Sequence, residues 1–146
     1  MNRFTLIFFL IVQFSFAQNI ENYRANFLKA VNNKTICDEM IQELKTYQKE
    51  TIYKAYLGAY ETIWANHAWN PISKLNSFNQ GKAKIEQAIS KAPNNIEIKL
   101  LRYSIQKNAP KFLNYSSNIE ADRNFILKHQ NSVKEESLQK LIKLVN

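Results

Sequence analysis

Residue types that carry out chemistry in many enzymes are scarce in this sequence, which has two histidines, His67 and His129, and one cysteine, Cys37. The histidines lie 62 residues apart, and neither a His-Glu-x-x-His motif nor a Cys/His spacing typical of zinc sites occurs. Because triads assemble in space, a serine or cysteine beside either histidine leaves an enzyme of unknown reaction as one alternative. No local motif supports that alternative, so we expect no catalytic residue, no metal and no cofactor.

A stripe of aromatic residues suggests recognition instead of reaction. Tyr56, Tyr60, Trp64 and His67 recur at steps of three and four, and Trp69 follows. Such spacing places side chains on one face of a helix, where aromatic residues usually belong to the core. A partly open stripe would instead line a groove suited to an extended peptide or a sugar. The candidate binding residues are therefore Tyr56, Tyr60, Trp64, His67, Trp69 and Lys74.

Several charged residues fall among apolar residues at helical spacing. An isolated charge that faces a core costs several kcal/mol, so each of these residues needs a partner. We expect an internal ion pair that fixes how two helices dock, with a ligand-facing polar pocket as the alternative. We expect one of the two cations to pair with one of the two carboxylates. The cations are Lys82 and Arg102, and the carboxylates are Asp122 and Glu97.

The elements that must position these residues are helices. Apolar residues recur every three or four positions from Ile20 to Val145, and no run of strict alternation indicates a strand. The sequence therefore predicts an all-α fold of about six helices in one domain, residues 18–146. Breaks are expected near residues 48–51, at Asn70-Pro71, at Pro93 and at Ala109-Pro110, and capping boxes at Ser117-x-x-Glu120 and Ser132-x-x-Glu135 are expected to open the last two helices.

The stretch HAWNPISK, residues 67–74, predicts a corner between two helices. Asn70 is a favoured N-cap residue, and Pro71 suits the first helical position, where its missing N–H has no partner to lose. We expect Trp69 to pack on the methylene stem of Lys74 and so to fix the corner.

The first 17 residues have the pattern of a cleaved secretory signal. Arg3 is followed by an apolar run, and Ser15-Phe16-Ala17 has the small residues of a cleavage site. The apolar run is shorter than the roughly 20 residues that a membrane-spanning helix needs. We therefore expect export to the periplasm or the exterior, with no transmembrane span in the mature chain. The lone Cys37 has no partner for an intramolecular disulfide and is expected to be buried.

Positive charge is concentrated in the middle of the chain. Residues 74–111 carry eight Lys or Arg residues against two Asp or Glu residues, whereas residues 18–73 carry six of each. Such a surface attracts anionic lipid, acidic polysaccharide or acidic protein. Sixteen lysines against four arginines disfavour nucleic acid as the partner.

The stretch GKAKIEQAISKAPNN, residues 81–95, resembles the second half of a tetratricopeptide repeat (TPR), with Gly81, Ile85, Ala88 and Pro93 at matching positions. Leu57-Gly58, residues 57–58, is similar to the Leu-Gly pair of that family's first helix, although the two parts lie some eleven residues farther apart than in the family. This resemblance implies a short right-handed array of antiparallel helical hairpins that holds a protein or peptide partner in a concave groove. The resulting hypothesis is an exported helical binding or scaffold protein. A basic module that docks on anionic envelope lipid or polysaccharide is the first alternative.

Overall fold

The computed structural model describes residues 20–145, so the expected signal sequence lies outside the described residues. Within residues 20–145 the chain contains helices and connecting segments but no strand, which confirms the all-α prediction. Seven α-helices occur in this range where about six are expected: residues 20–30, α2 (Lys34–Tyr47), α3 (Thr51–His67), α4 (Pro71–Lys91), α5 (Ile96–Asn108), α6 (Ile119–His129) and α7 (Glu136–Ile142). Three short 3-10 turns accompany them: η1 (Lys111–Leu113), η2 (Gln130–Ser132) and η3 (Lys143–Val145).

Asparagine side chains open three of the helices. The Oδ1 atoms of Asn33, Asn70 and Asn95 each accept a hydrogen bond from the backbone N–H three residues later, at 3.1, 2.9 and 3.0 Å. Each bond satisfies a donor that would otherwise have no partner in the first turn of α2, α4 or α5. Pro71 occupies the start of α4, as the sequence predicts for the corner.

The two capping boxes expected near the C-terminus are not formed. α6 begins at Ile119 after Asn118, whose side chain makes no cap hydrogen bond, and α7 begins only at Glu136. The hydroxyl of Ser132 donates backward to the carbonyl of His129 at 2.7 Å, so Ser132 ends the preceding turn and does not open α7. The predicted capping box at Ser132 is therefore wrong, because its hydroxyl binds the carbonyl of the preceding turn and not an N–H group of α7.

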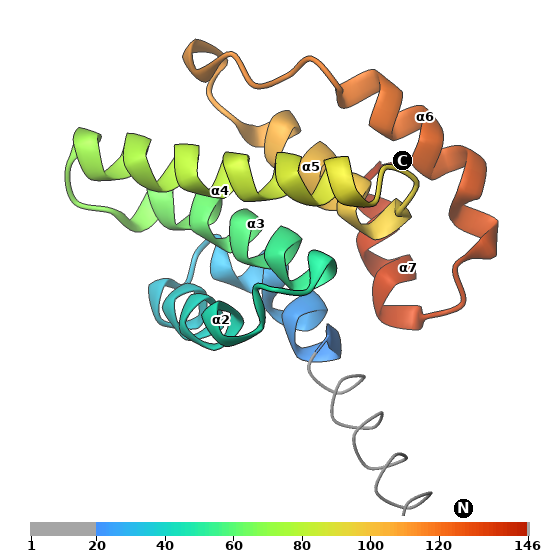
Figure 1. The fold of residues 1–146 in the computed structure, drawn as a ribbon, viewed down its shortest axis with the longest axis horizontal. Coiled ribbons are helices and arrows are strands. Elements are labelled where there is room, and N and C mark those ends of the chain that lie inside the picture. Colours follow the sequence, from blue (N-terminus) through green and yellow to red (C-terminus); the bar gives the residue numbers. More distant parts are fainter. Residues whose placement is uncertain (1–19, 146) are drawn as a thin grey trace, which may run out of the picture.

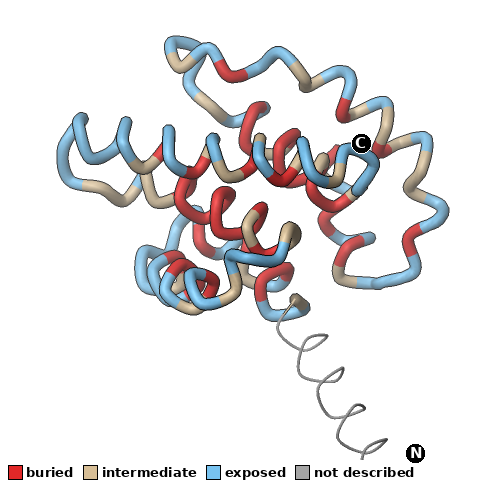
Figure 2. The backbone as a smooth tube through the Cα atoms, in the orientation of Figure 1, coloured by how far each residue is buried: buried red, intermediate tan, exposed pale blue. Residues whose placement is uncertain are grey.

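The helix α3 forms the centre of the fold. Residues 55–63 are buried without interruption, and α3 contacts α2, α4 and α5 (Figure 1). Figure 2 shows the same arrangement, with buried backbone in the middle of the molecule and exposed backbone on the outer sides of α2 and α4. Since α3 has neighbours on several sides, even its small residues are shielded from solvent.

Two glycines bring α3 and α4 into close contact. A Cβ atom added to Gly58 would lie 2.6 Å from the carbonyl oxygen of Gly81, and one added to Gly81 would meet Gly58 and Thr62 closer than atoms can approach. A glycine inside a helix costs about 1 kcal/mol against alanine, and this close approach of the two helices is the reason for Gly81, whose partner is the other glycine of the chain. Beside it, the hydroxyl of Ser77 donates to the carbonyl of Glu61 at 2.7 Å.

Trp69 does not hold the corner between α3 and α4. Its side chain is 97% exposed, so the expected packing on the stem of Lys74 is absent. The Asn70 cap and the fixed φ of Pro71 hold the turn without the indole.

No helix among residues 20–145 is long and apolar enough to cross a bilayer.

Candidate functional site

Tyr56 and Tyr60 lie in the core and are not available to a ligand. Both side chains are 0% exposed. The Tyr60 hydroxyl donates to the carbonyl of Tyr23 at 2.7 Å, and the Tyr56 hydroxyl donates to Glu97 at 2.6 Å. The open-groove interpretation of the aromatic stripe is therefore wrong at these two positions, because helices cover α3 where the sequence alone allows an open face.

Trp64 and His67 are partly buried and join the N-terminal helices to α3. One ring nitrogen of His67, Nε2, lies 2.8 Å from the carbonyl oxygen of Ala30. The ammonium of Lys34 lies over the Trp64 ring, 5.4 Å from its centroid. Trp64 and His67 therefore each contact another part of the chain. Trp69, in contrast, is exposed.

Arg102 and Asp122 form one of the expected ion pairs, between α5 and α6. The guanidinium donates through Nε and Nη2 to the two carboxylate oxygens at 2.7 and 2.8 Å, with Asp122 0% exposed. Lys99 Nζ lies 3.4 Å from the same carboxylate, and Arg102 Nη1 lies 3.0 Å from Glu86. Two parallel hydrogen bonds in a buried site orient the two helices as well as neutralising the charges.

Glu97 pairs with a cation outside the predicted set. Arg24, from the helix of residues 20–30, donates Nε and Nη2 to the Glu97 carboxylate at 2.8 and 2.7 Å. Lys82 takes no part in an ion pair among the described residues, and its ammonium lies 4.8 Å from the centroid of the Tyr115 ring. The predicted partners of Lys82 and Glu97 are therefore wrong. Lys82 lies over an aromatic ring and not beside a carboxylate, and Glu97 pairs with Arg24.

Burial shifts the titration of the groups around α3. It raises the pKa of Tyr56 well above its usual value, with the charge and hydrogen bond of Glu97 acting in the same direction. It also raises the pKa values of Tyr60 and Tyr115. For Arg24, burial lowers the pKa, but the hydrogen bond and charge of Glu97 outweigh burial and the pKa is raised.

Two of the residues considered for catalysis, Cys37 and His129, have partners within the fold. Cys37 is buried, its Sγ lies 3.4 Å from the carbonyl oxygen of Tyr60, and burial raises the pKa of its thiol to about 12. A thiol with so high a pKa holds almost no thiolate near neutral pH and is a poor nucleophile. His129 Nδ1 lies 2.8 Å from the carbonyl oxygen of Phe125, whose ring stacks on the imidazole. Among residues 20–145 no three His, Cys, Asp or Glu side chains converge to hold a metal ion.

An apolar groove of about 1020 Å³ opens at one end of the molecule. It lies between the ends of several helices, and its lining residues come from 27–32, 62–66, 71–78, 103–113 and Leu144. Phe27, Ile63 and Phe78 form part of its floor and belong to the core. Apolar pockets of this size are typical binding sites.

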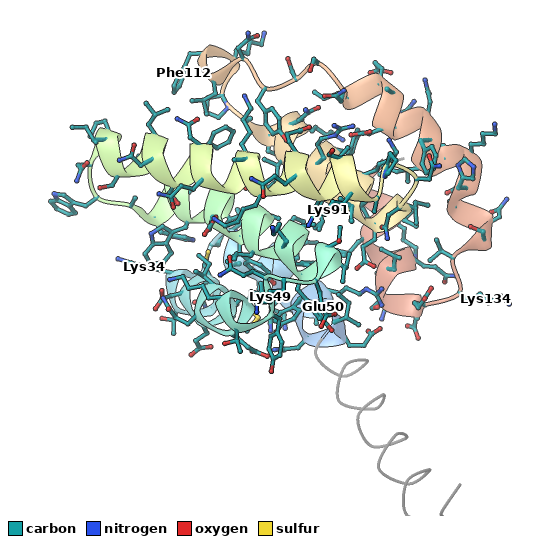
Figure 3. The ribbon with its side chains drawn as sticks, in the orientation of Figure 1. Lys34, Lys49, Glu50, Lys91, Phe112 and Lys134 are labelled. Carbon is teal, nitrogen blue, oxygen red and sulfur yellow. The ribbon has the colours of Figure 1, made fainter. Side chains whose placement is uncertain are left out.

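Exposed apolar side chains concentrate around this groove. Four of the six large hydrophobic residues that are exposed among residues 20–145 line it: Leu28, Val31, Leu75 and Phe112. The other two, Trp69 and Ile72, flank its lining residue Pro71 at the α3–α4 corner. Figure 3 shows Phe112 on the connector after α5, where its side chain is 83% exposed. Exposed apolar side chains that gather at a concavity, as these four lining residues do, are typical of interaction sites.

The groove contains one buried polar group without a partner. The hydroxyl oxygen of Ser104 is shielded from solvent and has no hydrogen-bond partner among the described residues. The Nδ2 of the neighbouring lining residue Asn108 donates instead to the Ser104 carbonyl, at 2.8 Å. Because solvent does not reach this oxygen, a ligand in the groove could bond to it only if the surrounding side chains moved.

Of the sequence-predicted binding residues only Lys74 lines the groove. The signal for the other lining residues is the presence of apolar side chains close to helix ends, as at Leu75 and at Phe112, two residues after Pro110. That signal is weak because the groove is assembled from segments far apart in the sequence. Comparison of the chain with known protein families, curated proteins and solved structures gives no match.

Proposed function

We propose that this chain is an exported helical binding protein that holds an apolar peptide segment of a protein partner in the groove. The observation that carries the proposal is the coincidence of a concavity of about 1020 Å³ with four exposed apolar side chains that line it. Covering these side chains removes apolar surface from water, which is the main source of affinity in such interfaces.

The chemistry of the lining supports binding and not reaction. Its polar residues are hydroxyls, amides and two lysines, and none of the residues that line the groove is a His, Cys, Asp or Glu. A nucleophile in the groove, such as the Ser104 hydroxyl, would thus have no base within the lining to activate it.

We further propose that the helices form a TPR-like array of antiparallel hairpins. The contacts between α3 and α4 support this, because Lys54 lies near Gln87, Gly58 near Gly81, and Glu61 near Ser77. Position numbers rise along α3 while they fall along α4. Gly81 stands at the helix crossing, and Ala88 is buried, as the resemblance to the repeat implies for small residues.

Export is part of the proposal and rests on the pattern of residues 1–17. Expression of the full chain with its own N-terminus in a Gram-negative host should yield a processed form that begins at Gln18. Mass spectrometry of the periplasmic and medium fractions checks this, and an unprocessed chain retained in the cytoplasm would contradict it.

The binding proposal is tested with a panel of fluorescein-labelled apolar peptides and fluorescence anisotropy. Leu75→Gln places an amide in the groove, whereas Ile72→Gln makes the same kind of change on an exposed side chain of α4 that does not line it. We expect Leu75→Gln to weaken binding of the best peptide about tenfold, as loss of one apolar contact does. Equal effects of the two substitutions, or no binding by any peptide, would overturn the proposal.

A further inference from the structure

The charges around the groove are of one sign. The wall segments 27–32, 62–66, 71–78 and 103–113 contain four lysines and no Asp or Glu residue. These lysines are Lys29, Lys74, Lys107 and Lys111. Lys74 and Lys107 themselves line the groove, while Lys29 follows Leu28 and Lys111 precedes Phe112 in the chain.

Four of the five other cations in the basic middle segment have partners within the chain, and the fifth, Lys91, is exposed at the far end of α4. Lys84 binds Glu61 at 2.7 Å, and Lys99 and Arg102 face Asp122. Lys82 lies over an aromatic ring. Glu61 precedes the groove-lining Thr62 in sequence, but its carboxylate accepts two hydrogen bonds from Lys84, at 3.0 and 2.7 Å.

None of the four wall lysines has such a carboxylate partner among residues 20–145. Lys107 reaches only the carbonyl oxygen of Leu144, at 3.4 Å, and the ring of Tyr103. A groove with apolar walls and an unneutralised cationic rim is complementary to a chain with apolar side chains and carboxylates.

From this complementarity we propose that the bound segment is acidic: its apolar side chains fill the groove, and Asp or Glu residues beside them pair with Lys74 and Lys107. This inference rests on the proposed function and adds the chemical class of the partner.

The shape of the site favours a peptide over an anionic bilayer. A bilayer surface meets convex or flat protein surfaces, whereas the lining residues here, Phe78 and Ile63 among them, lie at the floor of a concavity. Side chains that project from a peptide can reach such a floor while the carboxylates stay at the rim.

The test uses three labelled peptides with the same apolar residues, flanked by Glu, by Gln or by Lys. On the wild-type protein at low salt we expect the Glu peptide to bind about tenfold more tightly than the Gln peptide, and the Lys peptide to bind most weakly. The difference should shrink as salt is raised, because rim charges are screened.

Charge reversal assigns the effect to the groove. Lys74→Glu with Lys107→Glu should abolish the preference for the Glu peptide, and Lys74→Glu alone should halve it on a logarithmic scale. The control Lys91→Glu with Lys134→Glu changes net charge equally at exposed sites away from the groove walls (Figure 3). Lys91 ends the helix that carries Lys74, about 26 Å away along its axis. The control should keep the preference, and unchanged thermal melting shows that each variant is folded.

The outcomes separate the two proposals. Equal binding of all three peptides would overturn the acidic partner while leaving the groove as a binding site. Binding of none would overturn both. Sedimentation with phosphatidylglycerol vesicles but not with phosphatidylcholine vesicles, without peptide binding, would also overturn the inference and assign the rim lysines to a lipid surface.

Discussion

Charged residues are arranged differently in two regions of the molecule. One region is the interface of α5 with its neighbours, and the other is the end that carries the groove. Around α5, each buried carboxylate faces a guanidinium with two hydrogen bonds, as in the pairs Arg102–Asp122 and Arg24–Glu97. At the groove, lysines surround apolar side chains and no wall residue supplies a carboxylate. Both regions carry cationic side chains, but only the first region pairs them with carboxylates of the same chain.

This contrast separates structural charge from charge that is free to act. A buried ion pair must be matched internally because the cost of desolvation is otherwise too high. An exposed lysine needs no internal partner, so its charge remains available to a binding partner of opposite sign. The proposed recognition surface therefore rests on where the unmatched lysines lie, and not on the total charge of a segment.

The largest expected effect comes from breaking the internal pairs. Asp122→Ala leaves Arg102 and Lys99 facing a buried site without its carboxylate, and should lower the free energy of unfolding by about 3–5 kcal/mol. Urea denaturation followed by circular dichroism measures this. The control Glu136→Ala removes the exposed pair with Lys140 and should leave the melting temperature unchanged. An Asp122→Ala protein as stable as the wild type would mean that the pair does not hold α6 on α5.

A smaller effect is expected where α3 meets α4. Alanine at position 81 raises helix propensity, but its Cβ would strike the backbone of Gly58, so the helices must separate. We expect Gly81→Ala to lower stability by about 1–3 kcal/mol in denaturant unfolding. Gln80→Ala, on the exposed side of the same helix, should not. A Gly81→Ala protein more stable than the wild type would show that the crossing is loose.

High pH should weaken the core. In the unfolded chain tyrosines ionise near pH 10, whereas burial raises the pKa values of Tyr56, Tyr60 and Tyr115 in the fold. Their contribution to stability is therefore complete below about pH 10 and is lost as the pH rises above it. Absorbance of tyrosinate should rise in step with unfolding. A rise that precedes unfolding would place these phenols in contact with solvent.

The Cys37 thiol offers a related test at moderate pH. Since burial raises its pKa to about 12, Ellman's reagent should react at pH 8 only as fast as the protein opens. In urea above the unfolding midpoint the reaction should be immediate. Rapid labelling of the native protein would contradict the buried position of this residue.

The smallest effect on stability is expected at the groove. Phe112→Ser changes an exposed side chain and should alter the free energy of unfolding by less than about 0.5 kcal/mol. It should nevertheless weaken peptide binding several-fold, whereas Trp69→Ser, at an exposed residue outside the lining, should not. Isothermal calorimetry on both variants measures the difference. A larger loss for Trp69→Ser would move the binding surface to the corner.

Local features of the fold were predictable from the sequence. The Asn70-Pro71 corner follows from capping chemistry, and the close approach at Gly81 follows from a glycine in a helical stripe. The pairing of Arg102 with Asp122 follows from charges on apolar faces. In each case, adjacent residues or the helical period carry the information.

Features that join distant segments were not predictable. Arg24 lies 73 positions from Glu97, and nothing in the pattern around either residue selects the other. Burial of Tyr56 and Tyr60 depends on helices that cover α3 from other parts of the chain. The groove combines the ends of several helices, so its lysines and apolar side chains meet only after docking.

The most direct test of the account is amide chemical-shift mapping of the ¹⁵N-labelled protein with the Glu-flanked peptide. Binding in the groove predicts saturable shifts in residues 27–32, 62–66, 71–78 and 103–113, with little change in α7. Shifts concentrated in α6 and α7, or spread evenly over the exposed lysines, would contradict a partner held in the groove.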